Sequence, residues 1–199
     1  MNSENRDSYN REAGNLVKQY ESITFEELNQ QTISLLPSSP CHVLDVGAGS
    51  GRDAAWFADQ GYQVTAIEPA VELLKRAKML HPSLKISWFE DSLPQLLLVK
   101  TLSSSFDLIW LSAVWMHLPQ SDRPAAFANL DALLNHAGRM MFTLRHGPAP
   151  QGRVFHPVSV EEILSLAANH NMKSVLVTET ADSFQRPEIS WDTVMLEKE

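Results

Sequence analysis

A run of glycines directly after a short apolar segment is the feature that most constrains the fold. The segment 43–51 reads VLDVGAGSG and places glycine at positions 47, 49 and 51. Glycine permits a sharp turn and lets backbone N–H groups approach a ligand without a clash from a Cβ atom. Such a turn is typical of the junction between a strand and a helix in an α/β domain, with a ligand over the turn.

The rest of the chain alternates apolar strand patterns with helix patterns. Strands are expected at 42–46, 63–68, 85–89, 106–112, 139–144, 173–178 and 191–196. Helices are expected at 53–60, 71–80, 121–135 (N-cap Ser121, Gly138 just beyond the end) and 159–168 (capping box at Ser159), with a short helical piece at 94–101 and a broken helical segment at 10–36.

This alternation predicts the fold class. Nearly continuous apolar strands separated by helices indicate a parallel sheet with helices on both faces. About twelve residues separate the last two strands, which leaves no room for a helix, so these strands are expected to pair as an antiparallel hairpin at one edge. We predict an α/β, doubly wound, seven-stranded and mostly parallel sheet whose ligand lies beyond the carboxyl ends of the strands.

Composition and charge limit the partners. The 199 residues carry a formal net charge of −8, which argues against a nucleic-acid or membrane footprint. A single cysteine, Cys41, forms no internal disulfide and suits a reducing compartment. The polar start lacks a signal-peptide pattern, and no apolar run approaches the roughly 20 residues of a membrane span. We expect one cytoplasmic domain, monomeric or homodimeric, with a helical lid at 1–36 and a core at 37–199.

The spacing of the glycines can be compared with the motifs that bind dinucleotides and phosphates. A dinucleotide fingerprint, G-x-G-x-x-G/A, fits Gly47 and Gly49 but needs a small residue where Arg52 stands. A phosphate-binding P-loop is excluded because no Gly-Lys-Ser/Thr follows. A structural turn without ligand and a dinucleotide-dependent oxidoreductase remain as alternatives.

Three acidic residues narrow the choice. Asp45 lies inside the first strand, where a buried charge requires a cationic or hydrogen-bonding partner. Glu68 ends the second strand and is placed to accept hydrogen bonds from the two hydroxyls of a ribose. Asp91 follows the third strand and can meet an exocyclic amine. Together these acids indicate a ligand with a ribose, an adenine and a cationic part but no pyrophosphate, and S-adenosylmethionine fits each of these features.

These motifs resemble a known family. The stretch VLDVGAGSGRDAAWFADQGYQVTAIEPA is similar to the first two motifs of class I S-adenosylmethionine-dependent methyltransferases, and FEDSLPQL with FDLIWLSAVWMHL is similar to the next two. The resemblance runs from about residue 36 to 144 and implies the Rossmann-like seven-stranded sheet with a reversed final hairpin. It also implies S-adenosylmethionine as cofactor and S-adenosylhomocysteine as product.

The resemblance also implies roles for single residues. It places Gly47, Ala48, Gly49 and Gly51 around the methionine portion of the cofactor. It implies a ribose contact from Glu68, beside Pro69, and an adenine facing Asp91 and Ser92 or Leu93. The loop at Ser112 is then expected to flank the methionine moiety.

The acceptor side is less constrained by sequence. Trp115 is expected either to shape the substrate pocket or to pack in the core. Arg145 is a candidate for holding a substrate carboxylate or phosphate, with loop stabilisation as the alternative. His146, with His117 behind it, is the candidate general base, and Tyr20 on the leading segment is a candidate for closing the site. The histidines show no metal-ligand spacing, so no metal is expected.

The expected reaction is methyl transfer to a small molecule with an oxygen or nitrogen nucleophile. The alternatives are a protein methyltransferase and a non-catalytic S-adenosylmethionine-binding module that acts as a sensor or partner subunit.

Overall fold

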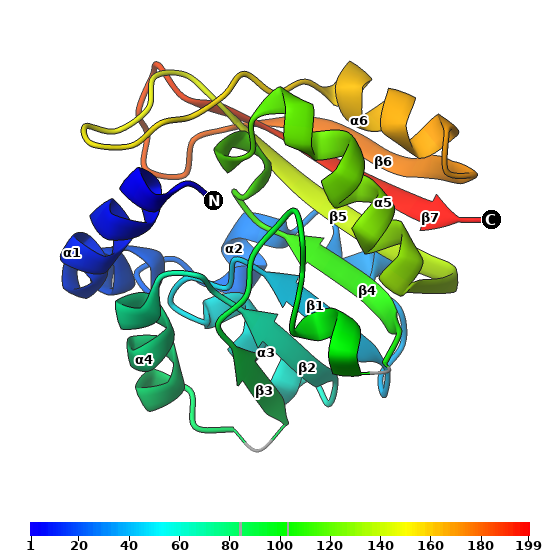
Figure 1. The fold of residues 1–199 in the computed structure, drawn as a ribbon, viewed down its shortest axis with the longest axis horizontal. Helices are drawn as coiled ribbons and strands as arrows, with labels where there is room; N and C mark the ends of the chain where they lie inside the picture. The colour runs from blue at the N-terminus through cyan, green and yellow to red at the C-terminus, as the bar shows by residue number, and fades with distance from the viewer. Residues whose placement is uncertain (84, 103) are drawn as a thin grey trace.

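One mixed sheet organises the computed structural model, which describes residues 1–83, 85–102 and 104–199. The seven strands are β1 (His42–Val46), β2 (Gln63–Ile67), β3 (Ile86–Phe89), β4 (Phe106–Leu111), β5 (Leu134–His146), β6 (Met172–Ala181) and β7 (Ser190–Lys198). They lie in the order β3-β2-β1-β4-β5-β7-β6, with β7 antiparallel to both of its neighbours (Figure 1). The predicted seven-stranded sheet with an antiparallel C-terminal hairpin is confirmed.

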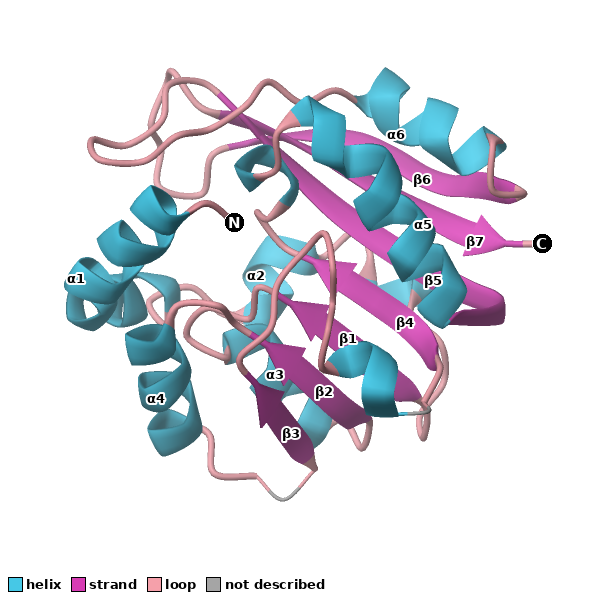
Figure 2. Cartoon of the chain, viewed as in Figure 1, coloured by secondary structure: helices cyan, strands magenta, loops and turns pink. Residues whose placement is uncertain are grey.

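Helices cover both faces of this sheet (Figure 2). On one face, α5 (Arg123–Leu133) and α6 (Val160–Ala168) pack on alternate residues of the central strands, such as Ile109 and Leu111 of β4. On the other face, α2 (Phe25–Asn29) and α3 (Arg52–Asp59) pack on the intervening residues, Leu108 and Trp110. Because side chains of a strand alternate in direction, one continuous apolar strand supplies both cores.

The N-terminal helix lies outside these two layers. Helix α1 (Ser3–Tyr20) packs against α4 (Val71–Leu80) beyond the carboxyl ends of the parallel strands (Figure 1). The side chain of Asn2 caps α1, and Thr24 and Glu27 form a capping box on α2. The leading segment is therefore helical with a break at 21–24, as expected, although α1 begins seven residues before the predicted start at residue 10.

Several predicted boundaries are wrong. Helix α5 begins at Arg123 after a short 3-10 turn, and the side chain of Ser121 does not cap it. Gly138 does not follow a helix end but lies inside β5, because the chain turns directly from α5 into an extended conformation at Leu134. The helical piece expected at 94–101 is reduced to a 3-10 turn, Val99–Leu102.

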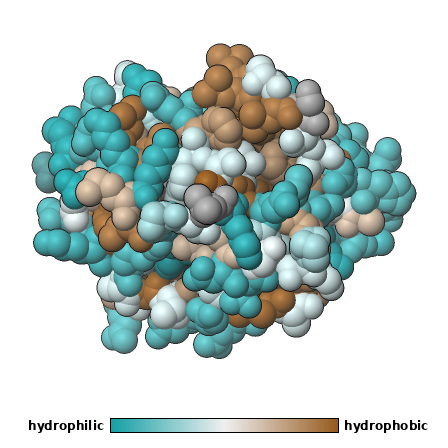
Figure 3. Space-filling view, turned by 90° about the horizontal axis from the view of Figure 1, so that it is seen from below, coloured by the Kyte–Doolittle hydropathy of each residue, from teal (hydrophilic) through white to brown (hydrophobic). Residues whose placement is uncertain are grey.

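The surface is mixed. The face seen in Figure 3 shows separate hydrophobic patches set in a largely hydrophilic surface. The described helices include none with the length and apolar character that a membrane crossing requires.

Candidate functional site

A cavity of about 430 Å³ opens at the carboxyl ends of the parallel strands, beneath helix α1. Its lining includes every predicted cofactor-binding residue except Gly51. It also includes three of the residues predicted for catalysis or substrate binding, namely Tyr20, His117 and Arg145. We call the part around the glycine turn (Gly47–Gly51) the glycine side, and the part formed by Met116, Thr143, Arg145, Phe155 and Trp191 the Arg145 side.

The glycine turn joins β1 to α3 and needs glycine at specific positions. Gly47 has φ of +71°, and a Cβ atom there would lie 2.7 Å from Cγ2 of Val114. Gly51 has φ of +87°, and a Cβ atom there would lie 2.7 Å from Cη2 of Trp88. Gly51 therefore serves the start of α3 and does not reach the cavity wall.

Glu68 connects the end of β2 to this turn. Its Oε2 accepts the backbone N–H of Gly49 at 3.0 Å, and its Oε1 accepts that of Ala70 at 2.8 Å. The residue is only 5% exposed, and burial raises the pKa of its carboxyl group to about 7. Each oxygen of a carboxylate accepts more than one hydrogen bond, so Glu68 keeps acceptor capacity towards the cavity.

Asp45 is the second buried acid of the glycine side. It lies on β1 in register with Ala66 and Trp110 and is 2% exposed. Burial, followed by the nearby charge of Asp53, raises the pKa of its carboxyl group. Its Oδ2 has no hydrogen-bond partner among the described residues, and the residue lines the cavity. A buried carboxylate oxygen without a partner is costly unless a ligand supplies a donor.

Asp91 has a different environment from these two acids. Its carboxylate accepts four backbone N–H groups, from Ser92, Leu97, Leu98 and Val99, at 2.8 to 3.1 Å. These bonds hold the loop after β3 and place Ser92 and Leu93 on the cavity wall. A contact between Asp91 and an adenine stays a prediction.

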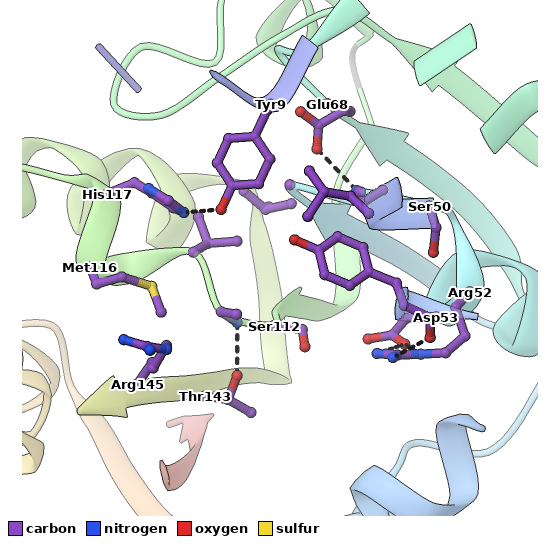
Figure 4. Close-up of a pocket in the computed structure, with 18 of the residues that line it drawn as sticks. Tyr9, Ser50, Arg52, Asp53, Glu68, Ser112, Met116, His117, Thr143 and Arg145 are labelled. Atoms are coloured by element: carbon purple, nitrogen blue, oxygen red, sulfur yellow. Dashed lines mark hydrogen bonds and ion pairs between the residues drawn. The ribbon is translucent and has the colours of Figure 1, made fainter. Parts of the chain in front are cut away.

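A network from α1 reaches His117. The amide of Asn5 accepts from the N–H of Val154 at 2.7 Å and donates to its carbonyl oxygen at 2.8 Å, which fixes the orientation of that amide. The same Nδ2 lies 3.2 Å from Nδ1 of His117, and Tyr9 Oη lies 3.1 Å from Nε2 (Figure 4). His117 therefore accepts at Nδ1 and donates from Nε2 to the hydroxyl oxygen of Tyr9.

The protonation of this network follows from its burial. Desolvation lowers the pKa of His117 to about 3, so the ring is neutral at neutral pH. Burial also raises the pKa of Tyr9 and of Tyr20, so both phenols are protonated. Tyr9 receives a hydrogen bond from His117 and keeps its own hydroxyl hydrogen for another acceptor. His117 thus reaches the cavity with both ring nitrogens engaged.

Two sequence-predicted residues lie away from the cavity. Trp115 is fully buried and packs edge-on against Phe142 at 5.2 Å between ring centroids, so the core alternative holds and the pocket alternative does not. His146 lies next to Arg145 on β5, but its Nε2 contacts Asp192 at 2.7 Å outside the cavity. Adjacent residues of a strand point to opposite faces, so Arg145 faces the cavity and His146 does not.

Sequence reasoning missed several polar residues of the wall. Arg153 and Arg186 line the cavity with the carboxylates that they pair with, Glu12 and Asp182. They come from segments far apart in the chain and share no motif, so no local pattern reveals them. Across the described residues, no group of three or more His, Cys, Asp or Glu side chains is arranged to hold a metal ion.

Known methyltransferases resemble this chain in sequence and in fold. Residues 43–138 match the family model of a methyltransferase domain. The structure of the N-methyltransferase NodS from Bradyrhizobium japonicum WM9 with S-adenosyl-L-homocysteine superposes with a TM-score of 0.74, at 19% identity over 98% of each chain. Magnesium protoporphyrin IX methyltransferase from Synechocystis, solved with bound S-adenosylmethionine, gives 0.71 at 14% identity, over 98% of this chain and 95% of that one. The chain thus shares the fold of these S-adenosylmethionine-dependent methyltransferases, and its residues 43–138 match the methyltransferase domain model.

The curated relatives are longer than this chain, and the matches cover only part of each. A ubiquinone biosynthesis O-methyltransferase from Xanthomonas oryzae is 35% identical over 111 residues, which are 54% of this chain and 44% of that protein. Glycine N-methyltransferase from Rattus norvegicus is 26% identical over 170 residues, which are 73% of this chain and 58% of that protein. The chain thus spans about half the length of the curated relatives it matches.

Proposed function

We propose that this protein is an S-adenosylmethionine-dependent methyltransferase that acts on a small molecule. The observation that carries the proposal is the pair of buried acids beside the glycine turn. Asp45 offers an oxygen without a partner, and Glu68 offers remaining acceptor capacity at the end of the next strand. Among the described residues neither acid forms an ion pair, and the only cations that act on them are Arg52 and the N-terminal amine, at longer range.

The residues present fit the cofactor. Asp45 would receive the cationic amino acid part, Glu68 the ribose hydroxyls, and the turn at Gly47 would give room for close approach of the backbone. Ser92, Leu93 and Ser112 supply the adjoining wall. When bound, S-adenosylmethionine supplies a methyl group already activated by the neighbouring sulfonium.

The chain's own contribution is mainly positioning. Holding two reactants in contact can supply about 7–11 kcal/mol of a barrier. Helix α1 lies over the cavity and places Tyr9 and Tyr20 on its wall. His117 orients Tyr9 through its Nε2–H, and neither of its nitrogens is free to take a proton. We therefore infer an acceptor whose nucleophile needs no proton removed by an imidazole of this chain.

The size of the cavity supports a small acceptor. A volume of about 430 Å³ lies in the range of small-molecule sites, about 300–1,000 Å³. The formal net charge of −8 also disfavours an anionic polymer such as a nucleic acid.

Product formation tests the proposal. The protein is incubated with S-adenosylmethionine and either the small-molecule filtrate or the protein fraction of a cell extract, and S-adenosylhomocysteine is quantified by mass spectrometry. We expect product with the filtrate, and its loss in Glu68→Ala. The matched control is Glu72→Ala, an exposed acid nearby that pairs with Lys75 and does not line the cavity. Product with the protein fraction alone would indicate a protein acceptor. Cofactor binding without product in either fraction would indicate a non-catalytic module.

A further inference from the structure

We infer that the methyl acceptor is an organic anion whose carboxylate or phosphate group is bound by Arg145. The inference rests on the proposed function, since it assigns the occupant of the Arg145 side of the same cavity. The observation behind it is that, of the arginines that line the cavity, Arg145 alone forms no ion pair with a described residue.

Four arginines line the cavity, and they differ in their partners. Three of them form ion pairs with carboxylates of the chain: Arg52 with Asp53 at 2.7 Å, Arg153 with Glu12 at 2.6 Å and Arg186 with Asp182 at 2.7 Å. Arg145 forms no ion pair with any residue that the structure describes. In Figure 4 it lies across the cavity from the Arg52–Asp53 pair, beside Met116, with no dashed contact to another side chain.

The contacts of Arg145 do not neutralise it. Its Nη1 donates to the carbonyl oxygen of Gly147 at 3.3 Å, and its guanidinium carbon lies 5.3 Å from the centroid of the Phe155 ring. The residue is 8% exposed, and burial followed by the charge of Arg186 lowers the pKa of its guanidinium group. A guanidinium remains charged at any working pH, so this cation is held in a partly desolvated place without a counter-ion.

Of the acids that act on Arg145, Asp182 is committed to other partners, and Glu188 is exposed. Asp182 and Glu188 act on Arg145 only at longer range. Both oxygens of Asp182 are occupied, because Asp182 binds the guanidinium of Arg186, the indole N–H of Trp191 at 3.0 Å and the backbone N–H of Phe184 at 3.1 Å. Asp182 therefore fixes two neighbours of Arg145 in the wall and does not compensate Arg145 itself.

The surroundings of Arg145 define the rest of the ligand. Arg145 of β5 lies directly opposite Trp191 of β7 in the sheet register, which gives the guanidinium a rigid base. Phe155, Met116 and Trp191 add aromatic and thioether surface beside it. One forked donor next to apolar walls is suited to a small molecule with an anionic group on an apolar body.

Matched probes test this assignment. Protein saturated with S-adenosylhomocysteine is titrated calorimetrically with benzoate, with its uncharged isostere benzamide and with phenyl phosphate. We expect benzoate or phenyl phosphate to bind at least about tenfold more tightly than benzamide, because a charge-assisted bidentate pair is among the strongest hydrogen-bonding contacts. The anion that binds more tightly shows whether Arg145 prefers a carboxylate or a phosphate.

Variants separate the binding role from a structural one. Arg145→Gln should remove the preference for the anion while the affinity for S-adenosylhomocysteine stays within about twofold, and Arg145→Lys should retain part of the preference. Arg139→Gln is the matched control, since Arg139 lies on the same strand, pairs with Glu197 and does not line the cavity. It should behave as the unaltered protein does.

The outcomes are distinct. Equal binding of all three probes, no binding of either anion, or an anion preference that persists in Arg145→Gln would each overturn the inference. The unaltered protein is first titrated with S-adenosylhomocysteine alone. If it does not bind this ligand, the proposed function is overturned, which is a different outcome from failure of the Arg145 inference.

Discussion

Glu68 accepts the backbone N–H of Gly49 at 3.0 Å, which ties the end of β2 to the glycine turn after β1. The other oxygen of Glu68 accepts the N–H of Ala70 at the start of α4. One buried carboxylate thus sets the relative position of two strands' ends and a helix before any ligand arrives. A site fixed in this way needs little rearrangement to bind, and rigid sites lose less free energy on binding.

The raised pKa of Glu68 predicts a specific pH dependence of stability. The carboxyl group has an ordinary pKa of 4.5 and a value of about 7 in the folded protein. Between these values the folded state holds a proton that the unfolded chain releases, so this group stabilises the fold at low pH, and the contribution is lost as pH rises through about 7. Thermal unfolding of the ligand-free protein should show this decline, and Glu68→Gln should reduce it; Asp45, whose pKa burial also raises, contributes the rest. An undiminished decline in Glu68→Gln would contradict the assignment.

The same titration affects ligand binding. Ribose hydroxyls donate to the ionised carboxylate, so affinity for S-adenosylhomocysteine should rise with pH up to about 7 and then level off. Calorimetry at several pH values measures this directly. An affinity that is independent of pH across this range would show that Glu68 does not carry the contact in its ionised form.

Gly47→Ala should destabilise the protein. The substitution forces a non-glycine residue to φ of +71° and places Cβ 2.7 Å from Val114, so we expect a loss of about 1–3 kcal/mol in the free energy of unfolding. Gly14→Ala in the middle of α1 is the control, because its nearest neighbour would be Arg76 at 3.6 Å and its φ is not in the left-handed region. That change should stabilise the helix by about 0.5–1 kcal/mol. Opposite signs in chemical denaturation support the account, and equal effects contradict it.

Asn5 anchors the covering helix. Asn5→Ala would leave the part-buried N–H and carbonyl oxygen of Val154, and the buried Nδ1 of His117, without the Asn5 amide as partner. We expect a loss of about 1–3 kcal/mol in the free energy of unfolding. Asn15→Ala, on an exposed position of the same helix, should change stability by less than about 0.5 kcal/mol. If the two variants unfold alike, the network does not hold α1 over the cavity.

His146→Ala should leave the site intact. The imidazole contacts Asp192 outside the cavity, so turnover and cofactor affinity should stay within about twofold of the unaltered protein. Steady-state kinetics with an identified acceptor check this. A large fall in kcat with unchanged folding would restore His146 as a catalytic residue and contradict its position in the structure.

The parts of the fold that the sequence predicted correctly depend on local patterns. Strand β1, the glycine turn and Glu68 lie within 27 residues, and each is specified by apolar runs and glycines next to one another. The predicted start of α5 was wrong because Ser121 is a good cap by residue type, yet the chain forms a 3-10 turn there, and α5 begins at Arg123 with Pro124 in its first turn. Gly138 was misread because a strand that starts immediately after a helix leaves no loop to mark the boundary.

Side-chain direction explains the remaining errors at the site. The fifth strand was expected to end at Leu144, which left Arg145 and His146 together in a loop. Since β5 continues to His146, strand geometry turns these two side chains to opposite faces. The direction of Trp115 is also set by local backbone geometry, because the 3-10 turn Trp115–His117 points its ring towards Phe142 in the core. Contacts among Asn5, His117 and Val154 join segments more than 100 residues apart, for which the sequence holds no local signal.

Binding of S-adenosylhomocysteine, with NADH as control, tests the central claim most directly. Calorimetric titration of the unaltered protein should show saturable binding of S-adenosylhomocysteine alone, and Glu68→Ala should abolish it while Glu72→Ala retains it. Binding of neither ligand, or of NADH alone, would contradict the assignment of the glycine turn and its two buried acids to this cofactor.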